Sequence, residues 1–177
     1  MTTRTIMKGR DIDRSLDRIS LEIVERNHGV TDIAIIGIHT GGVFLAQRIK
    51  TRIEERENTV LPSGTLDITL YRDDWSLISQ NPIVRKSEIG FLLEDKRVVL
   101  VDDVIFTGRT IRAAMDAIMD YGRPLSIQLA VLVDRGGREL PIQPDYVGMV
   151  VGAVPNERVD VLLDEKEKRD AVILSKR

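Results

Sequence analysis

The sequence predicts an α/β fold with a mostly parallel central sheet that is covered by helices on both faces. Short apolar runs alternate with segments whose apolar residues recur at helical spacing, in the order strand, helix, strand, strand, helix, strand. Chains with this alternation build parallel sheets whose two faces both require a helical cover. With 177 residues, the chain is expected to form a single domain over residues 1–177, and it can bury a large core without a metal or disulfide.

The first half of the chain contains two predicted helices and two predicted strands. One helix covers 11–27, where four apolar residues fall on one face (Ile12, Leu16, Ile19, Ile23), and it ends at His28-Gly29. A buried strand follows at 32–38. The next helix opens at Gly41-Gly42 and has a second apolar face (Leu45, Ala46, Ile49, Ile53). The run LDITL at 66–70 predicts the next strand.

The second half begins with a polar segment at 71–90 that contains Trp75 and Asn81-Pro82 and is expected to be a mobile flap. A strand at 98–101 is followed by a helix with another apolar stripe, which ends at Tyr121-Gly122 (Ile111, Ala114, Met115, Ile118). A strand at 126–133 comes next, then shorter strands at 145–151, 159–163 and 170–174. The charged run 164–170 is typical of a solvated turn.

Composition excludes several classes of protein. The chain has no cysteine and two distant histidines, which excludes a disulfide framework and argues against a zinc cluster. No run has the length of a signal peptide or a membrane span, so a soluble, cytoplasmic protein is expected. A net charge of −2 and 4% aromatic residues are not typical of a nucleic-acid binder, although a local basic patch remains compatible with them.

The most informative segment is VVLVDDVIFTGRT, from Val98 to Thr110. Its second part, Thr107 to Thr110, leads directly into a helix. A helix that starts near Arg109 leaves its first N–H groups without intrahelical partners, and these groups form an anion site together with the helix dipole. Gly108 permits close approach of the backbone. The turn therefore predicts a phosphate monoester as the ligand.

The first part of the segment is an apolar strand that ends in two adjacent carboxylates, Asp102 and Asp103. Ionised carboxylates accept hydrogen bonds, and the vicinal hydroxyls of ribose are suitable donors. The same negative field stabilises a positive charge that develops on a sugar ring. Since the usual triphosphate and dinucleotide motifs are absent, we predict a ribose 5-phosphate whose anomeric carbon becomes cationic. The alternative is a capped strand-to-helix turn without a ligand.

This segment resembles the phosphoribosyl pyrophosphate (PRPP) motif of type I phosphoribosyltransferases. Four segments are similar to the PyrR family, which combines regulation of pyrimidine operons with uracil phosphoribosyltransferase activity: LDITLYRDD at 66–74, VDDVIFTGRTIRAAMDA at 101–117, YGRP at 121–124 and LAVLVDRGGRELPI at 129–142. The resemblance extends from about residue 8 to residue 163. It implies a type I phosphoribosyltransferase fold, in which a small hood accompanies the central sheet.

The resemblance also implies a reaction in which uracil and PRPP give UMP and pyrophosphate, with Mg²⁺ as cofactor. Asp102 and Asp103 would hold the ribose hydroxyls, and Mg²⁺ would arrive with PRPP near them without a direct protein ligand. Arg72 would act in catalysis from a loop, 71–74, that closes over the substrate. The implied partners are PRPP, uracil, UMP, UTP and a pyr messenger RNA leader, and the implied assembly is a homodimer or homohexamer.

Further site residues follow from the same resemblance. The pyrophosphate-binding turn would consist of His39, Thr40, Gly41 and Gly42, and the base would be read by Val133, Asp134 and Arg135, largely through the backbone. The alternative roles are a solvated loop for Arg72 and an ion pair with Asp134 for Arg135. The PRPP-binding residues would be Val98, Val99, Leu100, Val101, Asp102, Asp103, Val104, Ile105, Phe106, Thr107, Gly108, Arg109 and Thr110.

The chain departs from the PyrR pattern at positions implied in RNA binding. Several positions that tend to be basic or histidine in RNA-binding members are occupied here by other residues (Leu21, Gly41, Gly137, Gln143, Met149), and Asp17 stands where threonine is common. Arg18 and Arg26 remain as candidate RNA-binding residues. Because phosphate neutralisation supplies much of the affinity for RNA, we expect the enzyme activity to be kept and RNA-mediated regulation to be weakened.

Two other functions remain open at this point. One is an RNA-binding attenuation regulator whose catalysis is incidental. The other is a purine-type phosphoribosyltransferase, because a PRPP site cannot by itself select a base.

Overall fold

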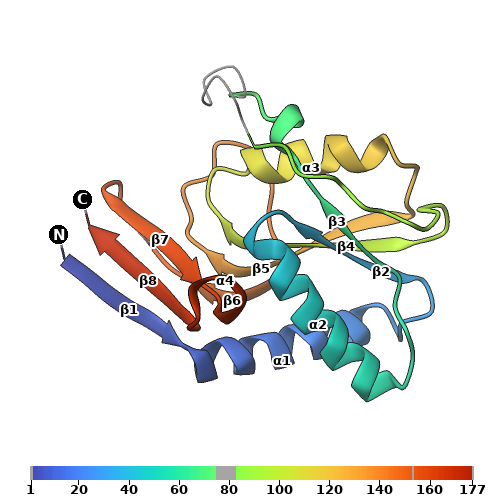
Figure 1. Ribbon diagram of the computed structural model, residues 1–177, viewed down its shortest axis with the longest axis horizontal. Coiled ribbons are helices and arrows are strands. Elements are labelled where there is room, and N and C mark those ends of the chain that lie inside the picture. Colours follow the sequence, from blue (N-terminus) through green and yellow to red (C-terminus); the bar gives the residue numbers. More distant parts are fainter. Residues whose placement is uncertain (1, 75–82, 153, 177) are drawn as a thin grey trace.

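A computed structural model of the chain describes residues 2–74, 83–152 and 154–176. The described residues form a central sheet of five strands in the order β3-β2-β4-β5-β6, and all the neighbouring strands are parallel (Figure 1). These strands are β2 (Ile33–Ile38), β3 (Ser63–Leu66), β4 (Arg97–Ile105), β5 (Ser126–Asp134) and β6 (Tyr146–Val150). The predicted α/β class with a parallel central sheet is confirmed.

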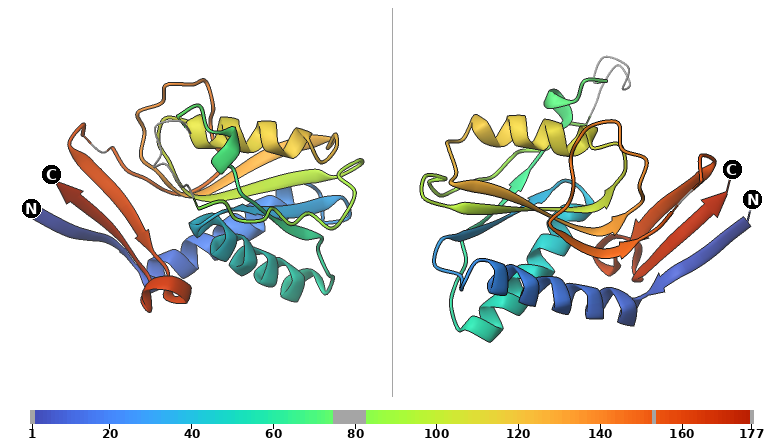
Figure 2. Two further views of the ribbon diagram at one scale, coloured as in Figure 1. Left: turned by 45° about the horizontal axis from the view of Figure 1, so that its top comes forward. Right: turned by 180° about the vertical axis from the view of Figure 1, so that it is seen from behind.

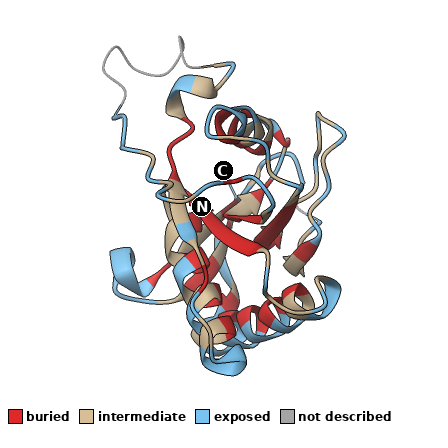
Figure 3. Cartoon of the chain, turned by 90° about the vertical axis from the view of Figure 1, so that its right-hand side faces the viewer, coloured by how far each residue is buried: buried red, intermediate tan, exposed pale blue. Residues whose placement is uncertain are grey.

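The sheet is covered on both faces, as expected. Helices α1 (Gly9–Arg26) and α2 (Gly41–Glu57) lie on one face, and α3 (Arg109–Met119) lies on the other, as Figures 1 and 2 show. Alternate residues of β4 enter the two cores: Val99 and Val101 pack toward α1 and α2, whereas Val98 and Leu100 pack toward α3. Figure 3 shows how burial concentrates in these central strands and on the inner faces of the helices.

A second, antiparallel sheet stands beside the first, in the order β1-β8-β7. It consists of β1 (Thr2–Lys8), β7 (Glu157–Leu162) and β8 (Ala171–Lys176), and the short helix α4 (Asp164–Glu167) joins β7 to β8. Figure 2 shows that this sheet brings the two ends of the chain close together. It is the small hood that the resemblance implied.

Several boundaries differ from the sequence prediction. The predicted strand at 66–70 is wrong: β3 covers Ser63–Leu66, and a 3₁₀ turn, η1, covers Thr69–Tyr71. The chain leaves the sheet there because the Asp67 carboxylate accepts two hydrogen bonds from Thr69. The N–H of Thr69 donates at 2.8 Å and its hydroxyl at 2.5 Å. Side chains of this kind favour turns over strands. The strand β1 was not predicted, because its edge position gives TTRTIMK little apolar patterning.

The run 164–170 is more than a solvated turn. Arg48 of α2 pairs with Glu165 at 2.7 Å and with Asp170 at 2.8 Å, and the Arg48 side chain is only 15% exposed. These ion pairs fix α4 against α2. Trp75, Asn81-Pro82 and the central part of the predicted 71–90 flap lie outside the described residues. In the described part of the chain, no helix is long and apolar enough to cross a membrane.

Candidate active site

The two adjacent carboxylates lie on a part of β4 that extends beyond its neighbour β2. The pairing with β2 ends at Gly37 and Val101, whereas the pairing with β5 continues to Ile105 and Asp134. Asp102 and Asp103 therefore lie within β4, which continues to Ile105, whereas the sequence predicts that they stand at the end of the strand. Their side chains emerge where β2 has already turned into the segment that begins at His39, at the carboxyl edge of the sheet, which is the usual ligand-binding edge of such folds.

Both carboxyl groups are strongly desolvated. Asp102 is 6% exposed, and burial followed by the charge of Asp103 raises the pKa of Asp102 well above its ordinary value. Burial is also the main cause that raises the pKa of Asp103, although the Val104 N–H donates to its carboxylate at 2.7 Å and opposes the shift. Two buried acids that repel each other favour the arrival of a positive charge, such as a metal ion or a sugar cation.

The predicted phosphate turn is present and rigidly held. Gly108 adopts φ +92°, a left-handed conformation that favours glycine, and α3 begins at the next residue. The carbonyl oxygen of Thr107 accepts hydrogen bonds from the N–H groups of Glu139 at 2.9 Å and Leu140 at 3.2 Å. The loop after β5 thus fixes the turn. At the start of α3 the Arg109 N–H donates to the Thr107 hydroxyl oxygen at 3.3 Å, a long hydrogen bond that an anion at the helix start would replace.

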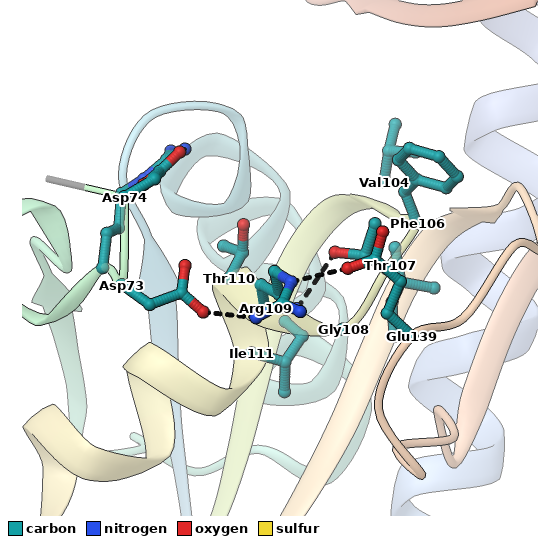
Figure 4. A pocket seen from close by; sticks show the side chains of 12 residues that line it. Asp73, Asp74, Val104, Phe106, Thr107, Gly108, Arg109, Thr110, Ile111 and Glu139 are labelled. Carbon is teal, nitrogen blue, oxygen red and sulfur yellow. Dashed lines mark hydrogen bonds and ion pairs between the residues drawn. The ribbon is translucent and has the colours of Figure 1, made fainter. Parts of the chain in front are cut away.

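A cavity of about 410 Å³ lies over this turn. Figure 4 shows Arg109 between two carboxylates, with Asp73 on one side and Glu139 on the other. The Arg109 guanidinium lies 2.5 Å from Asp73 and 2.6 Å from Glu139. Arg72, from the same loop as Asp73, lines the cavity as well and pairs with Asp74 at 2.8 Å. The cavity therefore brings residues of the predicted closing loop to the phosphate turn.

A second cavity of about 300 Å³ is lined by the two acids themselves. It shares Arg72, Val104 and Thr110 with the first cavity, so the two are adjacent. Of the predicted pyrophosphate turn, His39, Thr40 and Gly41 line it, and the peptide bond between His39 and Thr40 is cis. The remaining lining residues include Asp102 and Asp103 and, from the hood side, Val161, Leu163, Lys166 and Glu167.

Gly41 and Gly42 allow two close approaches. A Cβ atom at Gly41 would overlap the Oδ2 atom of Asp103, and one at Gly42 would overlap the carbonyl oxygen of Val101. The start of α2 can therefore press directly against the end of β4. This contact joins the predicted pyrophosphate turn to the predicted ribose-binding acids.

The predicted base-binding residues line neither cavity. Val133 is fully buried, and the carboxylate of Asp134 pairs with Arg138 at 2.7 Å, not with Arg135. The carbonyl of Asp134 accepts from Val151, and the N–H of Arg135 donates to Ile105, so neither backbone group is open to a base here. These residues support the neighbouring turn.

Arg135 instead supports an aromatic ring. Its guanidinium carbon lies 3.8 Å from the centre of the Phe106 ring, and its Nη2 atom donates to the carbonyl of Glu157 at 2.7 Å. Phe106 is 45% exposed and lines the larger cavity. The alternative expectation that Arg135 pairs with Asp134 is thus wrong.

Sequence reasoning missed Arg138, which ties this region together. Its guanidinium donates to the carbonyls of Phe106 at 3.0 Å and Ile142 at 2.8 Å and also binds Asp134. Arg138 thereby links the phosphate turn to the loop after β5. The only sequence signal was its place in the matching segment 129–142, which says nothing about its partners.

The two candidate RNA-binding residues on α1 make contacts inside the protein. Arg18 pairs with Glu22 and donates to the carbonyls of Val147 and Gly148, at 3.0 and 2.8 Å. Arg26 pairs with Asp145 at 2.7 Å and lies over the Tyr146 ring. Both side chains are about half exposed, so they reach the surface with their charges partly neutralised.

Comparisons with known proteins agree with this geometry. The family model described as "Phosphoribosyl transferase domain" matches residues 3–165. The curated "Bifunctional protein PyrR" of Syntrophobacter fumaroxidans is 51% identical over 97% of this chain and 92% of its own length. The protein of the same name from Thermoanaerobacter pseudethanolicus is 55% identical and covers 97% of each chain.

The chain belongs to the PyrR family of phosphoribosyltransferases. Its enzyme class is therefore that of the pentosyl transferases. Among solved structures, the hypoxanthine phosphoribosyltransferase of Trypanosoma cruzi has a TM-score of 0.72 at 16% identity, covering 98% of this chain and 96% of its own. Because the sequence identity is only 16%, this similarity establishes the type I phosphoribosyltransferase fold and nothing about activity.

Proposed function

We propose that this protein is a uracil phosphoribosyltransferase that converts uracil and PRPP to UMP and pyrophosphate. The observation that carries the proposal is that Asp102 and Asp103 line the smaller cavity, which adjoins the cavity over the phosphate turn. One cavity contains the phosphate turn before α3, and the other contains the turn at His39. A pentose that carries a phosphate at one end and a diphosphate at the other matches this order of sites.

The chemistry follows from the charges along the cleft. The N1 atom of uracil forms a bond to the anomeric carbon of the ribose while the bond from that carbon to the pyrophosphate oxygen breaks. The electron pair leaves with pyrophosphate, and the proton of N1 is taken up by the departing pyrophosphate. Positive charge develops on the sugar ring, where Asp102 and Asp103 accept hydrogen bonds from the hydroxyls and stabilise that charge. Arg72 would approach from the loop at 71–74, which limits access of water to the cation.

The residues present fit a magnesium ion that arrives with the substrate. The described residues contain no cluster of three or more potential ligands, so a dedicated protein cage is absent from that part of the chain. Mg²⁺ usually keeps several waters and is bound with substrate phosphates, and the negative charge of Asp102 and Asp103 would favour an ion that arrives with PRPP beside them. When bound, Mg²⁺ would neutralise charge on the leaving pyrophosphate.

The choice of uracil rests on the sequence relatives. The matching segments at 66–74 and 129–142 belong to the PyrR pattern, and the curated PyrR proteins cover almost the whole chain. A purine-type activity is the alternative, because the cavities alone do not select a base. The exposed ring of Phe106 at the larger cavity supplies an apolar surface for either kind of base.

Formation of UMP tests the proposal directly. Purified protein with PRPP and Mg²⁺ is expected to produce UMP from uracil, with little product when Mg²⁺ is chelated. A competition among uracil, orotate, hypoxanthine and guanine is expected to yield UMP as the main product. Predominant use of hypoxanthine or guanine would establish the purine alternative instead, and no product from any base would refute the enzymatic role.

Regulation through a pyr messenger RNA leader is the second function we propose, in a weakened form. The partial neutralisation of Arg18 by Glu22 and of Arg26 by Asp145 favours weak binding. Asp17, which stands where threonine is common in the family, lies on the same helix and pairs with Arg52 at 2.8 Å. We expect weak affinity for the pyr leader, modulated by UMP or UTP. Tight binding with a steep dependence on salt would contradict this expectation.

We also propose that residues 1–177 act as one phosphoribosyltransferase domain whose loop at 71–90 closes during catalysis, and that the active form is a homodimer or homohexamer. Light scattering of the purified protein measures the mass of the assembly. A monomer that forms UMP at full rate would exclude a role for the assembly in catalysis.

A further inference from the structure

The pyrophosphate side of the cleft contains a cation that comes from the hood. Lys166 of α4 lines the smaller cavity together with His39, Thr40 and Gly41, although it lies more than a hundred residues further along the chain. The sequence pattern of 164–170 predicts a solvated turn, and it indicates no role for these side chains at the site.

The turn at residues 39–42 has neither lysine nor arginine of its own. Among the described residues that line the smaller cavity, the lysine and arginine side chains are Arg72 and Lys166, and the carboxylates are Asp102, Asp103 and Glu167. Arg72 is already paired with Asp74 at 2.8 Å through two nitrogen atoms. A diphosphate carries several negative charges, so a further positive group on this side of the cleft would add to the neutralisation that Mg²⁺ supplies.

Lys166 is available for that role. Its Nζ atom lies 3.7 Å from the nearest carboxylate, Glu167, and its side chain is 62% exposed. A 3.7 Å separation is longer than a charge-assisted hydrogen bond, which is typically about 2.7–2.9 Å. The ammonium group can therefore turn toward an anion without breaking a tight pair.

The backbone that carries Lys166 is fixed, which makes the side chain a positioned group. Arg48 of α2 binds Glu165 and Asp170, on either side of Lys166, in four hydrogen bonds of 2.7–2.9 Å. Asp170 also accepts the N–H of Asp164 at 2.8 Å. Because α2 starts at the turn of residues 39–42, this network sets Lys166 relative to the same helix that the pyrophosphate would meet.

We propose that Lys166 is a pyrophosphate-binding residue that supplies from the hood a positive charge that the turn at 39–42 lacks. This inference rests on the proposed function. It predicts that Lys166 contributes to binding of PRPP and of the product pyrophosphate, but not to binding of uracil or of a ribose 5-phosphate that lacks the diphosphate.

The variant Lys166→Gln tests this inference, with Lys168→Gln as its matched control. Lys168 is an exposed lysine two residues away that lines neither cavity. For Lys166→Gln we expect the KM for PRPP and the inhibition constant of pyrophosphate to rise about tenfold, with the KM for uracil unchanged. Lys168→Gln should match the wild-type protein, and Lys166→Arg should restore most of the loss. Glu167→Gln should lower both constants, because it removes the competing carboxylate.

Calorimetric titration separates this inference from the proposed function, because it needs no turnover. Magnesium pyrophosphate is expected to bind Lys166→Gln about tenfold more weakly than it binds wild-type protein, whereas ribose 5-phosphate binds both equally. Equal affinity of pyrophosphate for both proteins would overturn the role of Lys166, even if wild-type protein forms UMP. Loss of affinity for both ligands would also overturn it, since that result indicates a general structural defect.

Discussion

The Arg109 guanidinium lies 2.5 Å from the carboxylate of Asp73, and this ion pair joins the loop after η1 to the first residue of α3. Glu139 binds the same guanidinium from the opposite side at 2.6 Å. Two carboxylates thus hold a cation at the turn where the 5-phosphate is proposed to bind. An incoming phosphate must compete with them for Arg109.

The variant Asp73→Asn is expected to lower the KM for PRPP by about two- to fivefold, because it removes one of the competing charges at a solvent-exposed pair. Steady-state kinetics at low and moderate salt measure this change, which should shrink as salt screens the pair. Asp116→Asn is the matched control, since Asp116 pairs with Arg112 at 2.5 Å on the same helix but lines neither cavity. An increase in KM would show that Asp73 helps to bind the substrate instead.

The two glycines at the start of α2 are expected to respond differently to alanine. At Gly42 the new Cβ meets backbone of β4, at Val101 and Asp102, which cannot move aside. Gly42→Ala should cost about 1–3 kcal/mol of stability, which corresponds to a fall in Tm of about 2–4 °C per kcal/mol. Thermal unfolding checks this, with Gly90→Ala as control, because a Cβ at Gly90 meets nothing within 4 Å.

At Gly41 the three atoms nearest to the new Cβ all belong to the Asp103 side chain, whose carboxylate would have to rotate away. Gly41→Ala should therefore fold with nearly wild-type stability while kcat/KM falls by about 10–100-fold, because the carboxylate leaves its position. Wild-type kinetics in this variant would show that the position of the Asp103 carboxylate does not matter for the reaction.

Asp102 is expected to oppose folding at neutral pH. Its pKa is raised in the folded protein by burial and by Asp103, so between the unfolded and the folded pKa the folded state keeps a proton that the unfolded state has lost, and above the folded pKa it holds a buried charge. The contribution of Asp102 to the free energy of unfolding therefore falls as the pH rises from the pKa of the unfolded state, about 3.9, toward the pKa of the folded state. Asp102→Asn removes this dependence, so we expect a higher Tm at pH 7 than the wild-type protein has, together with loss of UMP formation. Equal Tm values over pH 5–8 would contradict the unfavourable burial of a charge at Asp102.

The sequence was sufficient to predict the parts of the fold that depend on local pattern. The apolar faces of α1, α2 and α3 and the buried runs of β2 and β5 carry strong periodicity, and their predicted positions agree with the structure within about two residues. The prediction of a strand at 66–70 was wrong because LDITL has an apolar pattern, whereas the side chain of Asp67 stabilises a turn by binding Thr69. Edge strand β1 has no such pattern and was missed.

The candidate site divides in the same way. The acids and the phosphate turn are contiguous in sequence, so their chemistry could be predicted from Val98 to Thr110. Lys166 and Arg138 could not, because each reaches the site through tertiary contacts made far from it in sequence, such as the ion pairs of Arg48 with Glu165 and Asp170. Likewise, the burial of Val133 and the stacking of Arg135 on Phe106 depend on how β5 and β7 pack.

The variant Asp103→Asn separates catalysis from regulation. It keeps the size of the side chain but removes its charge, so we expect kcat to fall by about 10²-fold or more, as for loss of a preorganised electrostatic group. Affinity for the pyr leader should stay at the wild-type value, because Asp103 lies inside the cleft, away from Arg18 and Arg26 on α1. Retained turnover in this variant would indicate that the acid pair is not catalytic.

A crystal structure with PRPP and Mg²⁺ tests the central claim most directly. We predict the 5-phosphate at the N–H groups of residues 107–110, the ribose hydroxyls on Asp102 and Asp103, and the diphosphate between the turn at His39 and Lys166. Density for the sugar diphosphate elsewhere on the protein, or with its 5-phosphate away from the turn before α3, would contradict the account.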